Sequence, residues 1–367
     1  MNNKNIPEGT RDIIFEEADL YTNIIEKFNN VFIGAGFRQI MTPAIEYYDV
    51  FDYSGQSIEQ EQMYKLTDNN GRLAVLRADN TTPAARLVAT KLRGASLPQK
   101  LYYNQHVYRI NNGYSGKRNE ILQCGVEIIG NGGLKTDYIC ITTAIEVLKT
   151  LGINFKIEIG HVGYFNALIK ELNLSDSEMR LVRKYVDAKK SASLNNLEKI
   201  RRIPLLFGGI EIFDEVFELA GDNTEAVEAA NYVKTLYELL PNDKIMVDMG
   251  IVHQIDYYTG VVFGGYIEGA GEPVLSGGRY DNLIKNFDYD VPATGFAVNV
   301  CLVADVIKPF KHTPPEYIIH FDLDNIPQRE TFKNSELSGF DTYEETWNYA
   351  KTNGIKYVVY GSEVREV

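Results

Sequence analysis

The sequence has few of the side chains that build disulfides and metal sites. Its three cysteines, Cys124, Cys140 and Cys301, are widely spaced among 367 residues and form no CxxC pair. The five histidines are scattered along the chain. The sequence therefore indicates neither a disulfide framework nor a zinc site, and we expect no metal and no cofactor.

Long apolar runs are missing as well. No stretch approaches the ~18–20 consecutive apolar residues that a membrane-spanning helix needs. The start of the chain, Met1–Pro7, lacks the apolar core of a signal peptide. The glycine spacings fit neither a Walker nor a Rossmann motif, and no nucleophile elbow or HExxH segment is present. We expect a cytoplasmic protein that has no membrane partner.

Extended runs of positive charge are also absent. The chain has 37 lysines and arginines against 50 aspartates and glutamates, which gives a net charge of −13. Lys189-Lys190 and Arg201-Arg202 are short pairs of the kind found at solvated helix ends. Because nucleic-acid binders take most of their affinity from lysine and arginine contacts to phosphates, the sequence argues against tRNA as a partner.

The apolar pattern predicts an α+β fold with a mixed, largely antiparallel sheet flanked by helices. Residues 11–36 carry apolar side chains at helical spacing and end at two glycines, so they are predicted to form a helix. The predicted strands are short apolar, β-branched and aromatic segments: Phe37–Met41, Met63–Thr67, Arg72–Arg77, Leu101–Ile110, Ile121–Ile129, Lys156–Gly160 and Val261–Ile267.

A helical stretch interrupts this pattern from about residue 164 to residue 242. Ser175 and Glu178 form a capping box, in which each side chain can satisfy an orphan amide. Asp222 with Glu225 is predicted to open a second helix. We interpret this stretch as a helical insertion whose apolar stripes are ordinary core.

Prolines separate a small C-terminal unit. Pro314-Pro315 marks a linker, and beyond it Tyr317–Leu323 and Ile355–Tyr360 are predicted to be buried strands with a helix between them. We therefore expect one domain at residues 1–310 and a small α/β unit at residues 316–367.

The first candidate binding segment, Leu76–Arg86, leaves an apolar strand and enters a helix. It places the acid Asp79 next but one to the hydroxyl of Thr81, and such a pair can hold an α-ammonium group by charge-assisted hydrogen bonds. The alternative is that Asp79 caps the helix that follows it.

The second candidate segment, Tyr108–Glu127, has the pattern of two strands joined by a loop. Its charged and polar members near the strand positions are Arg109, Gln123 and Glu127. The alternative to a binding role is that Arg109 and Glu127 form an ion pair on the surface of the sheet.

Tyrosines gather in a third segment. Tyr257 and Tyr258 lie in Ile251–Gly260, and Tyr280 follows further along the chain. Taken singly, such tyrosines are usually core or surface aromatics with a hydrated hydroxyl. His161 follows a β-like run and is typical of a hydrogen-bonded structural residue rather than of a catalyst.

Together, these segments resemble the catalytic domain of the histidyl-tRNA synthetase family over roughly residues 5–305. The segments that carry the resemblance are Pro7–Asp12, Gly36–Pro43, Leu76–Arg86, Tyr108–Glu127, Ile251–Gly260, Ser276–Asp281 and Gly295–Leu302. The resemblance implies a class II aminoacyl-tRNA synthetase-like antiparallel sheet flanked by helices, and a self-dimer.

The resemblance also implies a histidine-binding pocket. The residues at the matching positions are Asp79, Thr81 and Gln123 for the amino group, Arg109 for the carboxylate, and Glu127 with Tyr258 for the imidazole, with Tyr257 and Tyr280 in the same pocket. A neutral imidazole has one donor and one acceptor nitrogen. A carboxylate and a phenol can therefore satisfy both nitrogens at once.

Four positions depart from the synthetase pattern. The family has a glutamate where this chain has Asn111, and arginines where it has Asn119, His253 and Leu302; Cys301 replaces the glutamate beside the last of these. A guanidinium clamps phosphates through two parallel hydrogen bonds. A chain that keeps the amino-acid pocket and lacks these groups is predicted to sense its ligand rather than to activate it.

A related family combines this domain with such losses, namely the regulatory subunits of ATP phosphoribosyltransferase that pair with a short-form catalytic subunit in histidine biosynthesis. The sequence resembles this family. The resemblance implies a non-catalytic chain that activates its partner, mediates feedback inhibition by L-histidine as effector, and assembles with the catalytic subunit into a hetero-octamer. The alternatives are an ATP-dependent histidyl-tRNA synthetase-like aminoacyl ligase and a tRNA-binding accessory protein.

Overall fold

The computed structural model describes most of the chain as two compact units, Met1–Pro309 and Phe310–Val367. The described residues are 4–53, 58–111, 117–172, 174–194, 197–251, 257–309, 313–323 and 332–367. Among these residues, no helix is both long and apolar enough to cross a membrane.

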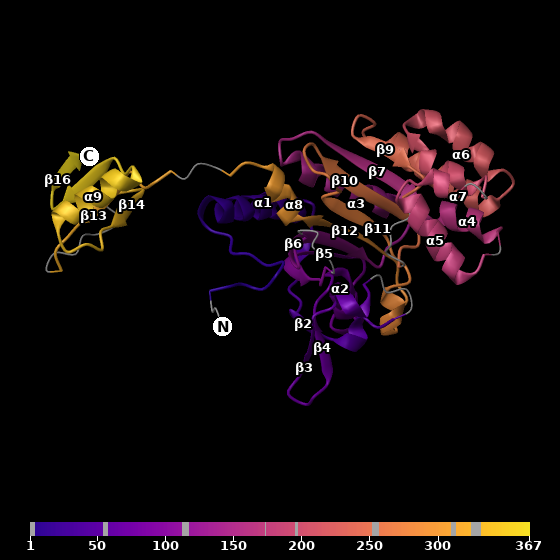
Figure 1. Cartoon of the computed structure of the whole chain (residues 1–367), viewed down its shortest axis with the longest axis horizontal. Coiled ribbons are helices and arrows are strands. Elements are labelled where there is room, and N and C mark those ends of the chain that lie inside the picture. Colours follow the sequence, from indigo (N-terminus) through magenta and orange to yellow (C-terminus); the bar gives the residue numbers. More distant parts are fainter. Residues whose placement is uncertain are drawn as a thin grey trace. The chain divides into compact units, whose positions relative to one another are not determined.

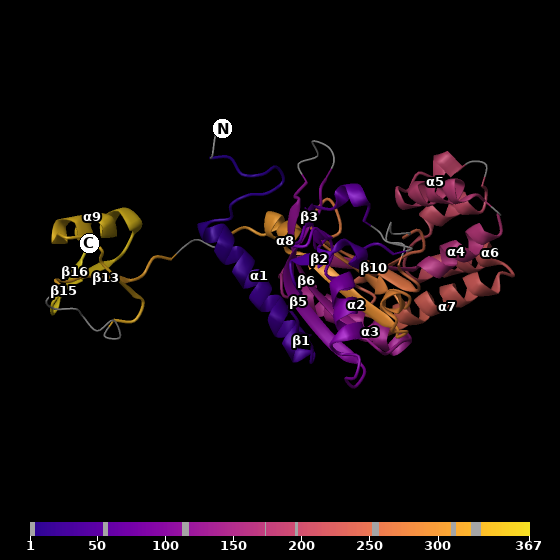
Figure 2. The same cartoon turned by 90° about the horizontal axis from the view of Figure 1, so that it is seen from below.

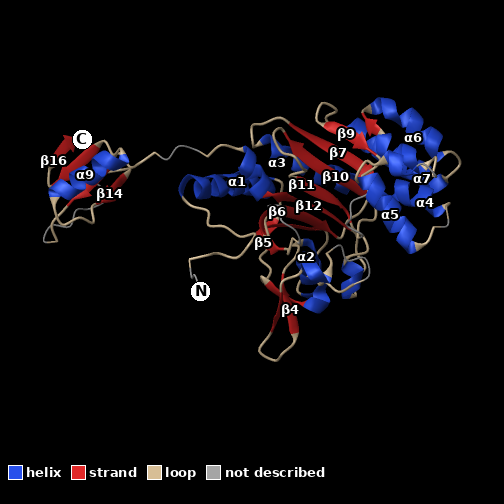
Figure 3. Cartoon of the chain, in the orientation of Figure 1, coloured by secondary structure: helices blue, strands red, loops and turns tan. Residues whose placement is uncertain are grey.

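A nine-stranded sheet forms the centre of the first unit (Figure 3). Its strands are, in spatial order, β1 (Arg38–Gln39), β5 (Gln99–Tyr108), β6 (Glu120–Ile129), β12 (Ala293–Asn299), β11 (Leu275–Arg279), β10 (Val261–Ile267), β7 (Phe155–His161), β9 (Ile245–Asp248) and β8 (Phe207–Gly208). Neighbouring strands are antiparallel except for the pairs β1–β5 and β7–β9, which are parallel. The predicted mixed, largely antiparallel sheet is therefore confirmed.

Helices cover both faces of this sheet. Outside the insertion they are α1 (Phe15–Gly34), α2 (Thr81–Thr90), α3 (Leu134–Lys149) and α8 (Val300–Val306). The helices α1, α3 and α8 share the main hydrophobic core with the sheet, and α1 lies along β6 (Figure 2). Helix α2 belongs to a second cluster, on the other face.

Alternation along β6 separates this core from the candidate site. Successive side chains of a strand point to opposite faces. Cys124, Val126 and Ile128 belong to the core that includes α1 and α3. Gln123 and Glu127 therefore point to the opposite face, where Glu127 lies across from the glycine Gly295 of β12.

The first helix is shorter than the predicted span of residues 11–36. It begins at Phe15, because the chain before it is held elsewhere: the amide of Asn119, beside β6, donates to the carbonyl of Gly9 with an N–O distance of 2.8 Å. The predicted stop at the glycines is confirmed, since Gly36 has a φ of 82° and follows directly on the C-cap.

The insertion consists of short helices beside β7 and β9 at one end of the sheet (Figure 1). Its α-helices are α4 (Val162–Lys170), α5 (Asp176–Asp187), α6 (Phe213–Ala220) and α7 (Thr224–Leu239). The capping box of Ser175 and Glu178 is confirmed. The second helix predicted in the insertion corresponds to α7. Its predicted first residue, Asp222, is wrong by one position, because the side chain of Asn223 caps α7 by accepting from the Ala226 amide at 3.0 Å.

A small three-stranded sheet precedes α2 in the chain. Its strands are β2 (Ile45–Tyr47), β4 (Leu73–Leu76) and β3 (Lys65–Thr67), with β4 in the middle. The first unit also has short 3₁₀ helices, which are η1 (Tyr48–Val50), η2 (Gln60–Gln62), η3 (Ser191–Leu194), η4 (Ile200–Leu205), η5 (Ile210–Ile212) and η6 (Ile284–Phe287).

The second unit is a four-stranded sheet packed against one helix. Its elements are β13 (Tyr317–His320), β14 (Ser335–Leu337), α9 (Tyr343–Asn353), β15 (Tyr357–Tyr360) and β16 (Glu363–Glu366), and the strand order is β14-β13-β15-β16. The three strands β14, β13 and β15 are parallel, and β16 is antiparallel to β15. The sequence does not predict β14 or β16, because β14 has three residues and β16 is exposed throughout.

Candidate functional site

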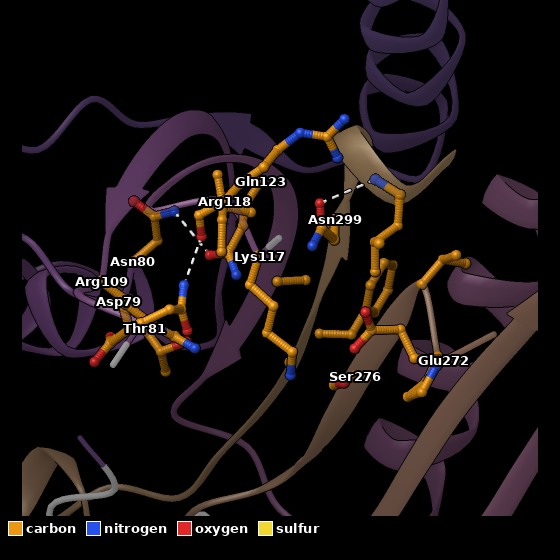
Figure 4. A pocket seen from close by; sticks show the side chains of 18 of the residues that line it. Asp79, Asn80, Thr81, Arg109, Lys117, Arg118, Gln123, Glu272, Ser276 and Asn299 are labelled. Carbon is orange, nitrogen blue, oxygen red and sulfur yellow. Dashed lines mark hydrogen bonds between the residues drawn. The ribbon is translucent and has the colours of Figure 1, made fainter. Parts of the chain in front are cut away.

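A cavity of about 770 Å³ opens on the face of the sheet that carries Gln123. Seven of the eight predicted histidine-binding residues line it, namely Asp79, Thr81, Arg109, Gln123, Tyr257, Tyr258 and Tyr280. Asp79, Thr81 and Arg109 lie together at one end, while Glu272 and Ser276 lie at the other (Figure 4). The cavity falls in the size range of small-molecule sites.

Asp79 is both a wall of the cavity and a capping residue. Its carboxylate accepts hydrogen bonds from the amide and the hydroxyl of Thr82, with donor–acceptor distances of 2.6 and 3.0 Å. Burial raises the pKa of the Asp79 carboxyl, and the bonds from Thr82 and the positive charge of Arg109 oppose that rise. The capping role and the position on the wall are therefore compatible.

A hydrogen bond to the backbone holds the Arg109 side chain, which faces the cavity. Its Nε donates to the carbonyl of Ala78 at 2.7 Å. In the described parts of the chain, no carboxylate forms an ion pair with Arg109, so the alternative of a surface ion pair with Glu127 is wrong. The two terminal nitrogens of this guanidinium carry the N–H groups that can bind a ligand carboxylate.

Glu127 is the predicted residue that does not reach the cavity wall. Only 1% of it is exposed. Its Oε2 accepts from the Tyr280 hydroxyl, and its Oε1 accepts from the Tyr103 hydroxyl at 3.2 Å. Burial raises the pKa of the Glu127 carboxyl to about 8, and hydrogen bonds from Tyr280, Thr81 and Tyr103 limit the rise.

Tyr103 is a residue of this site that the sequence reasoning missed. It is 1% exposed and sits on β5 directly opposite Gly125 of β6. A Cβ at position 125 would lie 2.5 Å from the Tyr103 hydroxyl oxygen, so the glycine makes room for the phenol. A tyrosine facing a glycine next to a buried acid is a signal that appears only once the strand register is known.

Three tyrosine rings build the apolar wall of the cavity. The centroids of Tyr257 and Tyr258 are 5.1 Å apart, and those of Tyr257 and Tyr280 are 5.8 Å apart, both in edge-to-face geometry. A Cβ at Gly278 would lie 2.8 Å from the Tyr258 ring, so this glycine is also needed for the packing. His253, a predicted point of departure from the synthetases, lies outside the described residues.

Two further departures, Asn111 and Asn119, are hydrogen-bonded to each other, and of the two only Asn111 is among the described residues that line the cavity. The Asn119 side-chain oxygen accepts from the Asn111 amide at 3.0 Å, and its nitrogen donates to the Glu8 carbonyl at 3.1 Å and to the Tyr64 hydroxyl at 2.9 Å. Asn119 is 9% exposed. Its amide therefore stabilises the N-terminal segment against the sheet rather than facing a ligand.

The remaining departures lie on α8. Leu302 lines the cavity with an apolar side chain, and Cys301 is buried, with its Sγ 3.5 Å from the amide of Leu122. Nearby, Arg118 makes two parallel 2.7 Å hydrogen bonds to Asp305. The guanidinium lowers the pKa of Asp305, and this pairing engages both terminal nitrogens of Arg118.

A buried ion pair holds the strand that leads to Tyr280. Arg279 contacts both oxygens of Asp137, with nitrogen–oxygen distances of 2.6 and 3.1 Å, and the Tyr232 hydroxyl donates to the same carboxylate at 2.6 Å. His161 lies nearby and caps α4 by accepting from the Gly163 amide at 3.1 Å. Burial and the charge of Arg279 lower the pKa of His161 to about 4. This contact is a structural one, in agreement with the sequence interpretation.

The fold and the pocket together define a class II aminoacyl-tRNA synthetase-like protein. Comparison with known proteins supports this class, because the family model for histidyl-tRNA synthetase matches residues 9–303. A solved histidyl-tRNA synthetase from Nostoc shares the fold, with a TM-score of 0.80 at 19% identity, and covers 100% of this chain and 95% of the other.

More similar proteins carry a more particular description. The ATP phosphoribosyltransferase regulatory subunit of Clostridium acetobutylicum is 38% identical, over 97% of this chain and 94% of its own; that of Bacillus cereus is 36% identical, over 96% and 90%. A Bacillus halodurans structure described as an ATP phosphoribosyltransferase regulatory subunit/histidyl-tRNA synthetase is 29% identical, with a TM-score of 0.85 and coverage of 98% and 99%. The chain belongs to the family of ATP phosphoribosyltransferase regulatory subunits.

Proposed function

We propose that this chain activates a short-form ATP phosphoribosyltransferase catalytic subunit and carries the feedback inhibition of that enzyme by L-histidine. One observation supports this most strongly: the cavity keeps the residues suited to an amino acid, whereas Asn119 and Leu302 stand where a synthetase has arginines. A pocket that binds histidine without consuming it gains a function when its occupancy alters a partner.

The cavity offers a partner for each group of L-histidine. Asp79, Thr81 and Gln123 would hold the ammonium group, and Arg109 would hold the carboxylate through charge-assisted hydrogen bonds. The imidazole would lie among the tyrosines in front of Glu127. A site with buried polar groups of this kind rejects ligands that leave those groups unpaired.

The chain is proposed not to activate histidine with ATP. Losing one preorganised group that stabilises developing charge costs on the order of 10²–10³ in rate, and the arginines expected near the phosphates are absent at Asn119 and Leu302. The alternative function, a histidyl-tRNA synthetase-like ligase, predicts histidine-dependent exchange of pyrophosphate into ATP. We expect no exchange above background, and clear exchange would favour the ligase.

The partner is proposed to be the short catalytic subunit, in a hetero-octamer built on a self-dimer of this chain. Allosteric control requires two states of the complex to which histidine binds with different affinity, and the coupling is reciprocal. The test is co-purification of the two proteins, followed by a phosphoribosyl transfer assay. The catalytic subunit should be slow alone, faster with this chain, and inhibited by histidine only in the complex.

Failure of the two proteins to associate, or equal rates with and without this chain, would contradict the proposal. Histidine inhibition of the catalytic subunit alone would place the effector site on the partner. These outcomes are separable, because association, rate and inhibition are measured independently on the same preparations.

A further inference from the structure

Asn80 is a buried amide beside the proposed ammonium site. It occupies the N-cap position of α2, yet its side chain makes no capping bond, because the neighbouring Asp79 accepts from the Thr82 amide instead. Asparagine is one of the residues that usually cap a helix. Asn80 is 1% exposed and belongs to the wall of the cavity (Figure 4). The start of the helix therefore does not account for this side chain.

The Asn80 side chain bridges two strands of the sheet. Its Nδ2 donates to the backbone carbonyl of Gln105 on β5 at 3.4 Å and to the side-chain Oε1 of Gln123 on β6 at 3.2 Å. Gln105 and Gln123 lie directly opposite each other in the two strands. A side-chain amide nitrogen carries two N–H groups, so both hydrogens of Asn80 have a partner.

These contacts fix which way both amides face. A backbone carbonyl can only accept, so the nitrogen of Asn80 faces Gln105 and its Oδ1 is turned away. The same nitrogen requires an acceptor from Gln123, which directs the Gln123 Oε1 toward Asn80. The oxygen of Gln123 therefore lies beside the segment of residues 79–81, which lines the same end of the cavity.

This orientation suits a ligand that donates hydrogen bonds. A carbonyl oxygen has two lone pairs, and the bond from Asn80 leaves one of those on the Gln123 Oε1 free for another donor. An ammonium group has three N–H donors and no acceptor. If the amide of Gln123 rotated by half a turn, its NH2 group would face both the ammonium and the NH2 group of Asn80. The bond from Asn80 therefore opposes the unfavourable orientation.

The same arrangement leaves one polar atom of Asn80 without a partner. Its Oδ1 is buried and receives no hydrogen bond in the described part of the chain. A buried carbonyl that accepts no hydrogen bond destabilises the folded state. The two bonds that Asn80 donates are offset by this loss, so we expect the asparagine to add little to the stability of the fold.

We propose that Asn80 is a positioning residue of the effector site, which orients the amide of Gln123 so that its oxygen accepts from the ammonium group of the ligand. The inference rests on the proposed function and deepens it, because it adds to the ammonium site a residue that acts through Gln123. The ligand class that this arrangement favours is a free α-amino acid, since an acylated or missing amino group cannot supply the ammonium donors.

The test is calorimetric titration of the full chain with L-histidine and with imidazolepropionate, the same molecule without the amino group. Asn80→Ala should weaken L-histidine about tenfold, which corresponds to one lost hydrogen bond to a charged group. It should leave the affinity for imidazolepropionate unchanged, because that ligand has no ammonium for the Gln123 oxygen. The denaturant midpoint of unfolding should stay at the wild-type value.

Gln123→Ala and the double variant complete a cycle that needs L-histidine alone. If Asn80 acts through Gln123, then Asn80→Ala should cause no further loss of affinity once Gln123 is alanine. Asn104→Ala is the matched control. Asn104 also has a buried Oδ1 without a partner in the described chain, but its Nδ2 donates to Asn29 of α1 at 2.7 Å, on the opposite face of the sheet. This control should bind both ligands like wild type.

The outcomes separate the inference from the proposed function. Equal affinity of wild type and Asn80→Ala for L-histidine would overturn the inference and leave the proposed function standing. Losses that add in the double variant would also overturn it, since Asn80 would then act independently of Gln123. The same holds for an Asn80→Ala variant that is less stable and weakens both ligands alike. If wild type binds L-histidine neither alone nor in the complex, the proposed function itself fails.

Discussion

The Glu127 carboxyl should make the stability of the first unit depend on pH. Burial raises its pKa from 4.5 to about 8. Between these values the folded chain binds more protons than the unfolded chain, so the free energy of unfolding falls as the pH rises. The contribution is fully present below pH 4.5 and is lost as the pH approaches 8. Its slope is up to ~1.4 kcal/mol per pH unit, and the total is on the order of 5 kcal/mol.

Glu127→Gln removes this dependence, because glutamine resembles the protonated acid in shape and carries no charge. We expect denaturant unfolding of wild type and variant to give similar stabilities near pH 5. Near pH 8 the variant should be the more stable of the two by several kcal/mol. Glu120→Gln, at the other end of β6, controls for the loss of one carboxylate. Curves for wild type and Glu127→Gln that run parallel from pH 5 to pH 8 would refute the reasoning.

Two other substitutions test the ion pair and the close packing beside the site. Asp137→Ala leaves the buried Arg279 guanidinium with only the partly exposed Asp281 as an ion-pair partner, so it should lower the free energy of unfolding by about 3 kcal/mol, measured by denaturant titration; a loss below ~1 kcal/mol would show that the buried pair contributes little. Gly295→Ala should abolish histidine binding in calorimetry, because the new Cβ would overlap the Glu127 carboxylate. Gly271→Ala is the control and should bind histidine normally, because a Cβ at position 271 would have no heavy atom within 4 Å. Binding by Gly295→Ala equal to wild type would contradict the close packing of Glu127 against Gly295.

Much of the sheet could be predicted from local sequence. The strands β5, β6 and β10 have runs of apolar and β-branched residues, and the predicted segments overlap them closely. The capping box of α5 likewise depends on two residues three positions apart. Such features need no information from distant parts of the chain.

The arrangement inside the site could not be predicted in this way. The pairing of Tyr103 with Gly125, and of Glu127 with Gly295, depends on the register between strands, and in the second case these strands are far apart in sequence. The same holds for Asn119, whose bond to the Glu8 carbonyl joins segments separated by about a hundred residues. Sequence motifs identified which residues belong to the cavity, and only the packing separates those that line it from those that support it.

The central proposal is that L-histidine bound in this pocket inhibits the catalytic partner. Its most direct test is the phosphoribosyl transfer rate of the complex, measured over a histidine titration with wild type and with Arg109→Ala. Arg109 lines the cavity and is suited to the histidine carboxylate, so the variant should leave activation largely intact and shift inhibition to about tenfold or more higher histidine. Loss of activation together with unchanged sensitivity to histidine would contradict the account.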